Sequence, residues 1–431
     1  MRRIAVLTTF VHVRAAYSLC NVVEAHVRML LRNGYETTFV ACDGFRPEGV
    51  YCDRSLRHWR MPAYLIDTDS EAVDRSTDYQ AGVERIVAAL RPLMPRIDVA
   101  ITHDLAYLPN YLAYNQACRQ LASEFPHVTW LHFLHSAPWP NPGLPESDPR
   151  SARFKPFDRS FLLYPNPQDI PRVSAQYAVD KSAVKVVPHP IDWENTFDFH
   201  PLTRALIQQF DLYAPDVFAI YPIRMDRGKQ PEKVVRLFAA LKAAGASVRL
   251  VIINSHSNRQ HFIDYRDDII SEVEPLGLTS REVIFTNQIE TLPGVSPRLL
   301  DSYRFEVPHR VVLDLFRLTN IYVHPSTAES YSLVSQEAAA SGNLLFLNED
   351  VPAMRTIYGN AARYLKFSSS RSSTVSRADE AEYYTGAAQD VLGSLRTEAT
   401  VYQRTRLRQT RHPQAVFHDW LEPLLYMLPP S

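Results

Sequence analysis

The feature that most restricts the fold is a regular alternation of short apolar runs with longer segments of helical periodicity. In the first half of the chain, a helical segment follows most of the apolar runs, which include RIAVLTTF, ETTFVAC, DVAITHD and VTWLHFLHS. A second series starts after residue 212 and includes the runs DVFAIYPIR, SVRLVIIN, EVIFTNQ and NIYVHPS. Strands that alternate with helices form parallel βαβ units, whose binding sites lie at the carboxyl ends of the strands. The sequence therefore predicts an α/β protein with two doubly wound, Rossmann-like domains that face each other across a cleft.

The domain boundaries follow from the same two series. With 431 residues the chain exceeds one ordinary core. We place the N-terminal domain at residues 1–195 and the second domain at residues 213–395, with a hinge at 193–212. Residues 396–431 have helical periodicity with a break at Pro413, and we expect these helices to return to the N-terminal domain.

Composition excludes several classes of protein. The formal net charge of -1 argues against general attraction to nucleic acid or to an acidic membrane. No apolar run approaches the length of a membrane span, and we interpret the N-terminus as a first strand and not as a signal peptide. The four cysteines lack the spacing of a metal site, which favours reduced thiols in a cytoplasmic protein.

One basic cluster stands out in this nearly neutral chain. It lies in the predicted C-terminal helices and consists of Arg396, Arg404, Arg406, Arg408 and Arg411. Such a run forms either a solvated helix face or a weak contact with a membrane surface or a nucleic acid.

The stretch HPSTAESYSLVSQEAAASGN, residues 324–343, places two acids beside one predicted helix start. Glu329 lies in the loop after a strand, Ser332 is suited to cap the helix, and Glu337 lies inside that helix. The amide groups of Ser332, Leu333 and Val334 would then face the binding edge, where a helix start attracts a phosphate. Taken singly, each acid also fits a solvent-facing loop or helix.

The stretch YPIRMDRGKQPEK places two cations after another strand. Arg224 follows the strand and Lys229 comes five residues later, before a helix. A guanidinium offers forked donors and an ammonium a point charge, and both suit a diphosphate. A solvated basic turn is the alternative interpretation.

Together these two stretches resemble the retaining GT-B glycosyltransferases of the family 4 type. In that family a strand is followed by an Arg and a Lys five positions apart, and a later strand ends in Pro-Ser before two glutamates with seven residues between them. Arg224, Lys229, Glu329 and Glu337 stand in these positions, and Pro325 and Ser326 provide the Pro-Ser pair. The clear resemblance covers residues 215 to 365.

The resemblance implies a donor site without a metal or another cofactor. Arg224 and Lys229 would hold the diphosphate of a UDP- or GDP-sugar, Glu329 would bind the sugar and Glu337 the ribose. Ser332, Leu333 and Val334 would meet the distal phosphate. In the family the base lies where this chain has Thr286 and Asn287.

The acceptor side departs from the family pattern. His135, at the end of a strand, matches the family's histidine beside the reacting sugar, and His103 and Asp104 end another strand. Where the family often has a Gly-Gly loop after the first strand, this chain has His12 and Arg14. The acceptor therefore stays open between a glycan, a lipid, a small molecule and a modified nucleic acid.

The resemblance predicts a hexosyltransferase, in enzyme class EC 2.4, and leaves two alternatives. A sugar-nucleotide epimerase of the same architecture would need no acceptor. A non-catalytic scaffold or binding protein of this fold would turn over no nucleotide sugar, although the intact Arg224, Lys229, Glu329 and Glu337 set argues against it.

Overall fold

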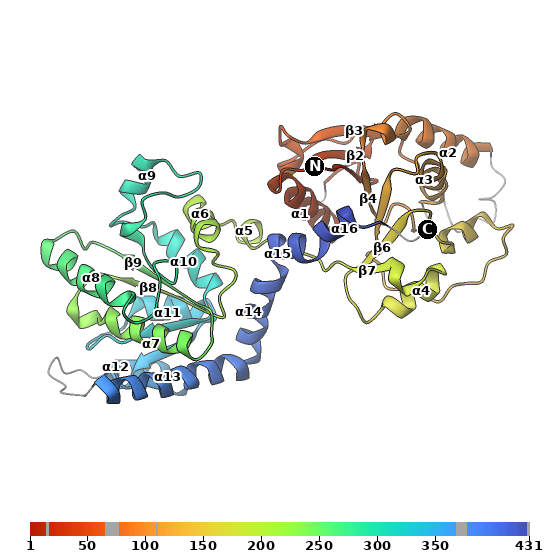
Figure 1. Cartoon of the computed structure of the whole chain (residues 1–431). Coiled ribbons are helices and arrows are strands. Elements are labelled where there is room, and N and C mark those ends of the chain that lie inside the picture. Colours follow the sequence, from red (N-terminus) through yellow and green to blue (C-terminus); the bar gives the residue numbers. More distant parts are fainter. Residues whose placement is uncertain (14–16, 65–76, 109–110, 368–376, 429–431) are drawn as a thin grey trace. The chain divides into compact units, whose positions relative to one another are not determined.

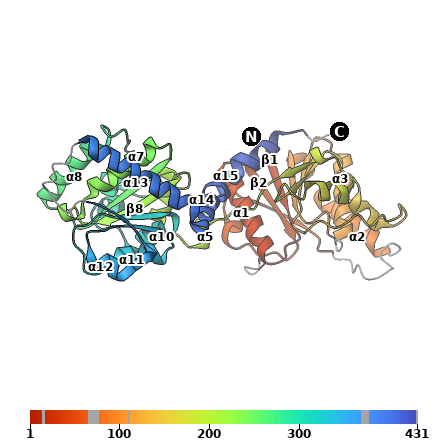
Figure 2. The same cartoon turned by 90° about the horizontal axis from the view of Figure 1, so that it is seen from below.

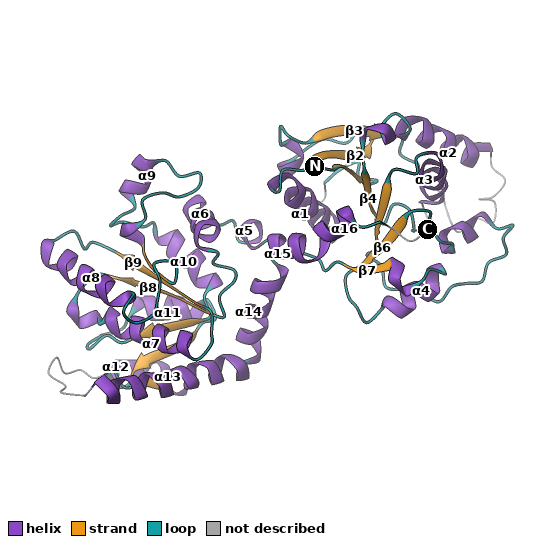
Figure 3. Ribbon diagram, in the orientation of Figure 1, coloured by secondary structure: helices purple, strands orange, loops and turns teal. Residues whose placement is uncertain are grey.

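The chain folds into two units, each built on parallel strands. The computed structural model describes residues 1–13, 17–64, 77–108, 111–367 and 377–428. Unit 1 consists of Met1–Ile191 together with Pro413–Ser431, and unit 2 consists of Asp192–His412 (Figure 1). Each unit is an α/β unit with helices around its strands, as expected from the two series in the sequence (Figure 3).

Unit 1 contains one seven-stranded sheet. Its strands are β1 (Arg3–Leu7), β2 (Glu36–Cys42), β3 (Arg57–Met61), β4 (Val99–His103), β5 (Thr129–Phe133), β6 (Ser160–Tyr164) and β7 (Val184–Val186). Its helices are α1 (Ser18–Arg32), α2 (Thr77–Leu90), α3 (Leu112–Glu124), α4 (Ile170–Tyr177), α15 (Pro413–Val416) and α16 (Glu422–Tyr426). The strand order is β3-β2-β1-β4-β5-β6-β7 with every pair parallel, which is the doubly wound order with its reversal between β1 and β4.

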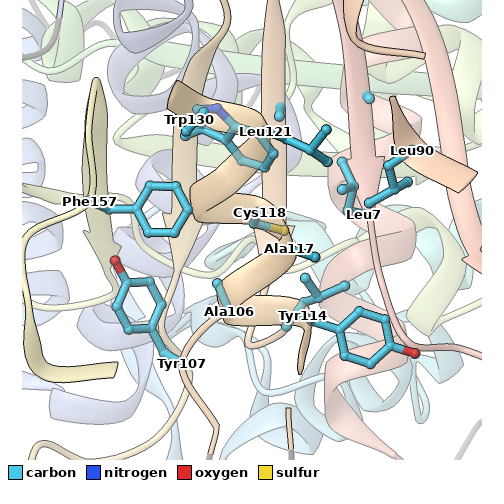
Figure 4. Close-up of a cluster of buried hydrophobic side chains, with 14 of the residues drawn as sticks. Leu7, Leu90, Ala106, Tyr107, Tyr114, Ala117, Cys118, Leu121, Trp130 and Phe157 are labelled. Carbon is cyan, nitrogen blue, oxygen red and sulfur yellow. The ribbon is translucent and has the colours of Figure 1, made fainter. Parts of the chain in front are cut away.

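Successive side chains of β1 point to opposite faces of the sheet, and both faces are buried. Ile4 and Val6 point into one buried cluster, which the C-terminal residue Phe417 completes. Ala5 and Leu7 point into the opposite cluster, which packs under α2 and α3 and appears in Figure 4. Strands buried on both faces read as continuous apolar runs, and this is the pattern that the sequence shows.

Unit 2 contains two three-stranded sheets in the orders β10-β9-β8 and β11-β12-β13. Its strands are β8 (Val217–Ile223), β9 (Val248–Asn254), β10 (Val283–Phe285), β11 (Ile321–His324), β12 (Leu344–Asn348) and β13 (Arg363–Leu365). Its helices are α5 (Trp193–Thr196), α6 (Pro201–Phe210), α7 (Pro231–Ala243), α8 (Gln260–Val273), α9 (Pro297–Ser302), α10 (His309–Leu318), α11 (Leu333–Ala340), α12 (Pro352–Tyr358), α13 (Arg377–Thr397) and α14 (Ala399–Arg411).

Asn320 joins the two sheets of unit 2 through its side chain and its backbone. Asn320 lies just before β11, and its Oδ1 accepts a hydrogen bond from the Phe218 backbone amide at 3.0 Å. The backbone amide of Asn320 donates to the Phe218 carbonyl at 3.1 Å. Its Nδ2 also donates to the Asp216 carbonyl at 2.7 Å. The combined order is β10-β9-β8-β11-β12-β13, again doubly wound, with the reversal between β8 and β11.

The predicted C-terminal helices are divided between the units. Helix α13 packs beside α7 in unit 2 (Figure 2), and α14 follows it. Arg408 on α14 is buried and donates to the carbonyls of Leu212, Tyr213 and Pro215, at 3.0, 2.7 and 2.5 Å. These bonds hold residues 396–412 on unit 2, so only the part from Pro413 onward lies in unit 1. The predicted break at Pro413 is confirmed, because α14 ends at Arg411 and α15 begins at Pro413.

Four of the five tail arginines illustrate how different their surroundings are. Arg404 donates to the carbonyls of Ser341 and Thr319, and Arg408 is fully inside unit 2, where burial lowers its pKa to about 9. Arg396 and Arg406 are exposed. Across the described ranges, no helix combines the length and the apolar character needed to cross a membrane.

Candidate functional site

In unit 2, the carboxyl ends of β8 and β11 bring together two of the predicted site residues. Lys229 lies in the 3-10 turn Arg227–Lys229 after β8, and Glu329 lies in the loop after β11. The Lys229 Nζ pairs with the Glu329 carboxylate, although a hundred residues separate them in sequence. Because the strand order reverses between β8 and β11, this pair occupies the position where open α/β sheets bind their ligands.

A histidine that the sequence analysis did not select completes this ion pair. The Nε2 of His324, the last residue of β11, lies 3.2 Å from Glu329 Oε1, a close contact that is not aligned as a regular hydrogen bond. The hydroxyl of Tyr322 contacts His324 Nδ1 at 3.0 Å and fixes the ring. Burial opposes ionisation of Glu329, but His324 and Lys229 outweigh it and lower the pKa of Glu329 to about 2. The carboxylate is therefore ionised at neutral pH.

Arg224, the residue that follows β8, remains accessible. Its side chain is 60% exposed and lies over the ring of Phe262, with 5.8 Å from the guanidinium carbon to the ring centre. Its nearest carboxylate is Asp226, at 3.8 Å. Such a loosely paired guanidinium at a strand end can bind an arriving anion with little reorganisation.

The start of α11 offers amide donors at the same edge. Ser332 is the N-cap, as predicted, and its Oγ accepts from the Ser335 amide at 3.4 Å. Its backbone has φ of +51°, in the left-handed region. The amides of Leu333 and Val334 have no acceptor among the described residues, as expected for the first turn of a helix, and Leu333 is exposed. This end of the helix can therefore bind an anion.

Glu337 lies on the same helix but is held by a different element. Its Oε1 is 2.8 Å from Nε2 of His309, the first residue of α10. His309 was not selected in the sequence analysis, because it stands outside the matching motif. The structure thus places Glu337 near the binding edge but apart from the pair of Lys229 and Glu329.

The predicted base site contains buried amides that lack partners. Thr286 and Asn287 follow β10 and are buried, and Thr286 Oγ1 accepts from the Asn254 amide at 3.3 Å. The side-chain amides of Asn254 and Asn287 have no hydrogen-bond partner among the described residues, although both are buried. Unpaired buried amides are costly, and a planar group with donors and acceptors along one edge would satisfy them.

In unit 1, three predicted residues meet at the carboxyl ends of β4 and β5. His103 Nδ1 lies 3.1 Å from His135 Nε2, and the His135 amide donates to Asp104 Oδ1 at 3.0 Å. Burial lowers the pKa of His135 to about 3 and raises the pKa of Asp104 to about 6. Asp104 has φ of +54°, an uncommon conformation for a residue other than glycine. His132, by contrast, is packed inside the sheet as expected, with Nδ1 2.8 Å from Thr102 Oγ1.

Two further histidines extend this group into a row. The ring centres of His26 and His103 are 5.1 Å apart, those of His103 and His135 5.3 Å, and those of His135 and His189 5.1 Å. Burial lowers the pKa of His26 and His189 as well, so the row is neutral at physiological pH. His26 was missed because helical spacing places it on the apolar face of α1, where a histidine usually packs in the core.

The other two predicted acceptor-side residues do not join this row. His12 is exposed and makes no contact with it, and Arg14 lies outside the described residues. Within the ranges that the structure describes, no group of three or more His, Cys, Asp or Glu side chains is arranged to hold a metal ion.

Comparisons with known proteins give matches only among solved structures. No protein family model and no curated protein matches the chain. A glycosyltransferase from Rickettsia africae ESF-5 matches with 12% identity and a TM-score of 0.33, over 98% of this chain and 94% of that chain. Sucrose-phosphate synthase from Thermosynechococcus elongatus matches with 17% identity and a TM-score of 0.34, over 99% and 96%. Anabaena HepE in complex with UDP matches with 12% identity and a TM-score of 0.34, over 99% and 100%.

Because the identities and TM-scores are low, the fold assignment rests on the two doubly wound strand orders, and functional inference rests on the side chains at their carboxyl ends.

Proposed function

We propose that the chain is a retaining glycosyltransferase that transfers a sugar from a UDP- or GDP-sugar to a hydroxyl acceptor. The observation that carries the proposal is the pair of Lys229 and Glu329 at the strand-order reversal of unit 2, beside the accessible Arg224 and the start of α11. The pyrophosphate of such a donor suits the cationic groups and the helix start at this edge, and its hydroxyls suit the ionised acid.

The roles divide between the units. In unit 2, Arg224, Lys229 and the amides of Leu333 and Val334 bind the diphosphate, and Glu329 binds sugar hydroxyls. The ribose contacts Glu337, and the base meets Thr286 and Asn287, whose amide is buried without a partner. In unit 1, His135 lies beside the reacting sugar, and His103 and Asp104 form the acceptor side.

The chemistry needs charge stabilisation more than a protein nucleophile. The bond between the anomeric carbon and the diphosphate oxygen breaks, and a bond from the same carbon to the acceptor oxygen forms on the same face. The acceptor proton passes to the departing diphosphate. Arg224, Lys229 and the start of α11 stabilise that leaving group, and in this proposal they take the place of a metal ion.

The cysteine pattern bears on the compartment of the enzyme, and the exposure of the tail arginines bears on how a large acceptor would be contacted. We place the enzyme in the cytoplasm because its cysteines show no disulfide or metal pattern. If the acceptor is carried on a membrane or a nucleic acid, the exposed Arg396 and Arg406 are the tail arginines that contact it.

A donor screen tests the proposal. The purified chain is incubated with UDP- and GDP-sugars, and thermal stabilisation and release of the nucleoside diphosphate are measured. We expect one donor to stabilise the chain and to be hydrolysed slowly, and Arg224→Ala and Glu329→Ala to abolish release. Arg227→Ala is the matched control, because Arg227 lies over the Tyr265 ring, 4.6 Å from its centre, and near Asp268.

The alternatives give different results in the same screen. An epimerised sugar, formed without any acceptor, would identify a sugar-nucleotide epimerase. Failure of every nucleotide sugar to bind would overturn the proposal and favour a non-catalytic scaffold.

A further inference from the structure

Unit 1 contains a small cavity beside the carboxyl ends of β4, β5 and β6, and Asp104 is the one lining residue that the roles above include. Its volume is about 160 Å³. This is well below the roughly 300–1,000 Å³ of sites for drug-sized ligands, so the cavity suits a single ring. Aromatic rings, one carboxyl and one guanidinium are the main lining groups: Tyr107, Trp139, Tyr164, Tyr177, Asp104 and Arg153.

The walls of this cavity are tied together by hydrogen bonds. The Trp139 amide donates to Gln176 Oε1 at 2.9 Å, and Asn141 Nδ2 donates to the Gln176 carbonyl at 3.0 Å. Arg172 donates to the Pro138 carbonyl at 2.9 Å. These bonds join the loop after β5 to α4, so the loop forms a defined wall.

Tyr107, one of the lining residues, has a buried hydroxyl that lacks a partner. Tyr107 is 3% exposed, and its hydroxyl has no hydrogen-bond partner among the described residues. Its ring packs edge-on against Tyr177, with 4.8 Å between ring centres, at one end of the cluster in Figure 4. A buried hydroxyl without a partner costs free energy, and a polar ligand would remove that cost.

A guanidinium in the cavity lacks a counter-charge. Arg153 Nε donates to the Tyr107 carbonyl at 2.8 Å, and the guanidinium lies over the Phe154 ring, 4.9 Å from its centre. No carboxylate of the described residues pairs with it, and its two terminal nitrogens have no acceptor there. Two parallel N–H groups of an arginine fit a carboxylate or a phosphate.

Two further groups supply contacts for a sugar ring. The Asp104 Oδ1 is occupied by the His135 amide, and no donor of the described residues bonds to its second oxygen, which can accept from a hydroxyl. Trp139 is 72% exposed at the cavity and offers an aromatic face for a sugar ring. Asp104 and Arg153 do not pair with each other, so the cavity presents an acceptor and a cation separately.

We propose that this cavity binds an anionic monosaccharide, in which Arg153 pairs with a carboxylate or phosphate and Tyr107 and Asp104 bind hydroxyls. The assignment of this sugar as the acceptor rests on the proposed function. The binding itself does not, because every group involved lies in unit 1.

Calorimetric titration of the full chain tests this proposal. The probes are glucose, galactose and mannose, each as the neutral sugar, the uronate and the 6-phosphate. We expect at least one anionic form to bind ten times or more tightly than its neutral parent, and the uronate and 6-phosphate arms identify the anion. Arg153→Gln should weaken that binding about ten- to a hundredfold, and Arg153→Lys should weaken it less.

Two further variants keep the test decisive. Arg150→Gln is the matched control, because Arg150 lies in the same 3-10 turn, is exposed and pairs with Asp148 at 2.5 Å. Its affinity for the anionic sugar should equal that of the parent chain. Tyr107→Phe removes one hydroxyl and should weaken binding about tenfold. If Arg153→Gln fails to fold, the affinities of Arg153→Lys and Tyr107→Phe for the anionic sugar decide whether the proposal holds.

The proposal is overturned if no anionic sugar binds, if neutral sugars bind equally well, or if Arg150→Gln weakens binding as much as the Arg153 variants. Loss of the proposed function is distinguishable, because it is measured by nucleotide-sugar binding to unit 2. If the chain binds an anionic sugar but no nucleotide sugar, the ligand proposed for this cavity is supported and the glycosyltransferase function is rejected. If it binds a nucleotide sugar but no anionic sugar, only the ligand proposed for this cavity is rejected.

Discussion

In unit 1 the carboxyl ends of the strands lie beside buried imidazoles, whereas in unit 2, which is also doubly wound, the carboxyl ends of β8 and β11 carry a charged pair. His26, His103 and His135 are held neutral by burial. Lys229 and Glu329 are charged and partly exposed, and Glu329 has a pKa of about 2. The doubly wound order determines where a ligand can bind, and the side chains at that edge determine its chemistry. From this comparison we expect the strand ends of unit 2 to bind a diphosphate. We expect those of unit 1 to bind a group that forms hydrogen bonds.

The largest expected effect tests the charged edge. Glu329→Gln keeps the shape of the side chain but removes the charge that pairs with Lys229. We expect release of the nucleoside diphosphate to slow by about 10²- to 10³-fold, as for loss of one group that stabilises a transition state. Glu349→Gln, at an acid that lies 3.6 Å from Arg355, is the control. Equal rates for Glu329→Gln and the parent chain would break the comparison, because the charges of unit 2 would then serve only its folding.

The second effect concerns a charge in unit 2 that lies at the opposite end of the sheet. Arg408 donates to three carbonyls before β8, and Arg408→Met leaves these buried acceptors unpaired. We expect the free energy of unfolding to fall by about 3–5 kcal/mol in urea titrations. Arg406→Met, at an exposed arginine of the same helix, should change it by less than about 0.5 kcal/mol. A small effect at Arg408 would show that the other contacts of α14, which include the hydrogen bonds of Arg404, are enough to hold it.

The third effect concerns the response of the buried imidazoles of unit 1 to pH. Burial lowers the pKa of five imidazoles of unit 1, those of His26, His103, His132, His135 and His189. The unfolded chain therefore binds protons at these positions first as the pH falls below about 6.5. The free energy of unfolding should therefore decrease from about pH 6.5 down to about pH 3, the folded pKa of His132 and His135. At pH 5, His132 alone accounts for about 2 kcal/mol. Glu329 acts in a lower window, because its stabilisation is lost only from about pH 4.5 toward about pH 2.

Urea titrations at pH 7 and pH 5 measure this difference. Tryptophan fluorescence reports mostly on unit 1, since Trp59, Trp130, Trp139 and Trp420 all belong to it. His132→Gln should reduce the pH dependence by about 2 kcal/mol, whereas His261→Gln, at an exposed position of unit 2, should not change it. An unchanged pH dependence in His132→Gln would contradict the neutral, buried state of this ring.

The smallest effect concerns the cap of α11. Ser332→Ala removes the hydroxyl that accepts from Ser335 and should cost about 1 kcal/mol. Ser332→Gly should cost only a few tenths of a kcal/mol, because glycine adopts a positive φ without strain. Ser341→Ala, after the last turn of α11, is the control. If Ser332→Ala and Ser332→Gly unfold at the same denaturant concentration, the left-handed backbone is not a constraint.

The sequence predicts most strands, because those buried on both faces read as apolar runs. It did not predict β3, with the sequence RHWRM, because Arg57 and His58 at the edge of the sheet interrupt any apolar pattern. Pairing with β2 makes this segment a strand, and such pairing is not encoded in the segment itself.

The candidate site was predictable to the extent that its residues follow strands. Lys229, Glu329, His103 and His135 each stand at or after a strand end, and the structure brings each into contact with a partner. His324 ends β11 and could have been found by the rule that selected His135. The contacts of His26 and His309 arise when helices pack on distant segments, and no local pattern encodes them.

The chain passes between the units at residue 192 and again at residue 413, and this has a practical consequence. A fragment ending at Ile191 would lack Val416, Phe417 and Leu421, whose side chains are wholly buried among those of α1 and β1. Its apolar face would stay open to water, and such surfaces aggregate. Dissection of this protein therefore calls for a circular permutant, or for a linker that rejoins Ile191 to Pro413.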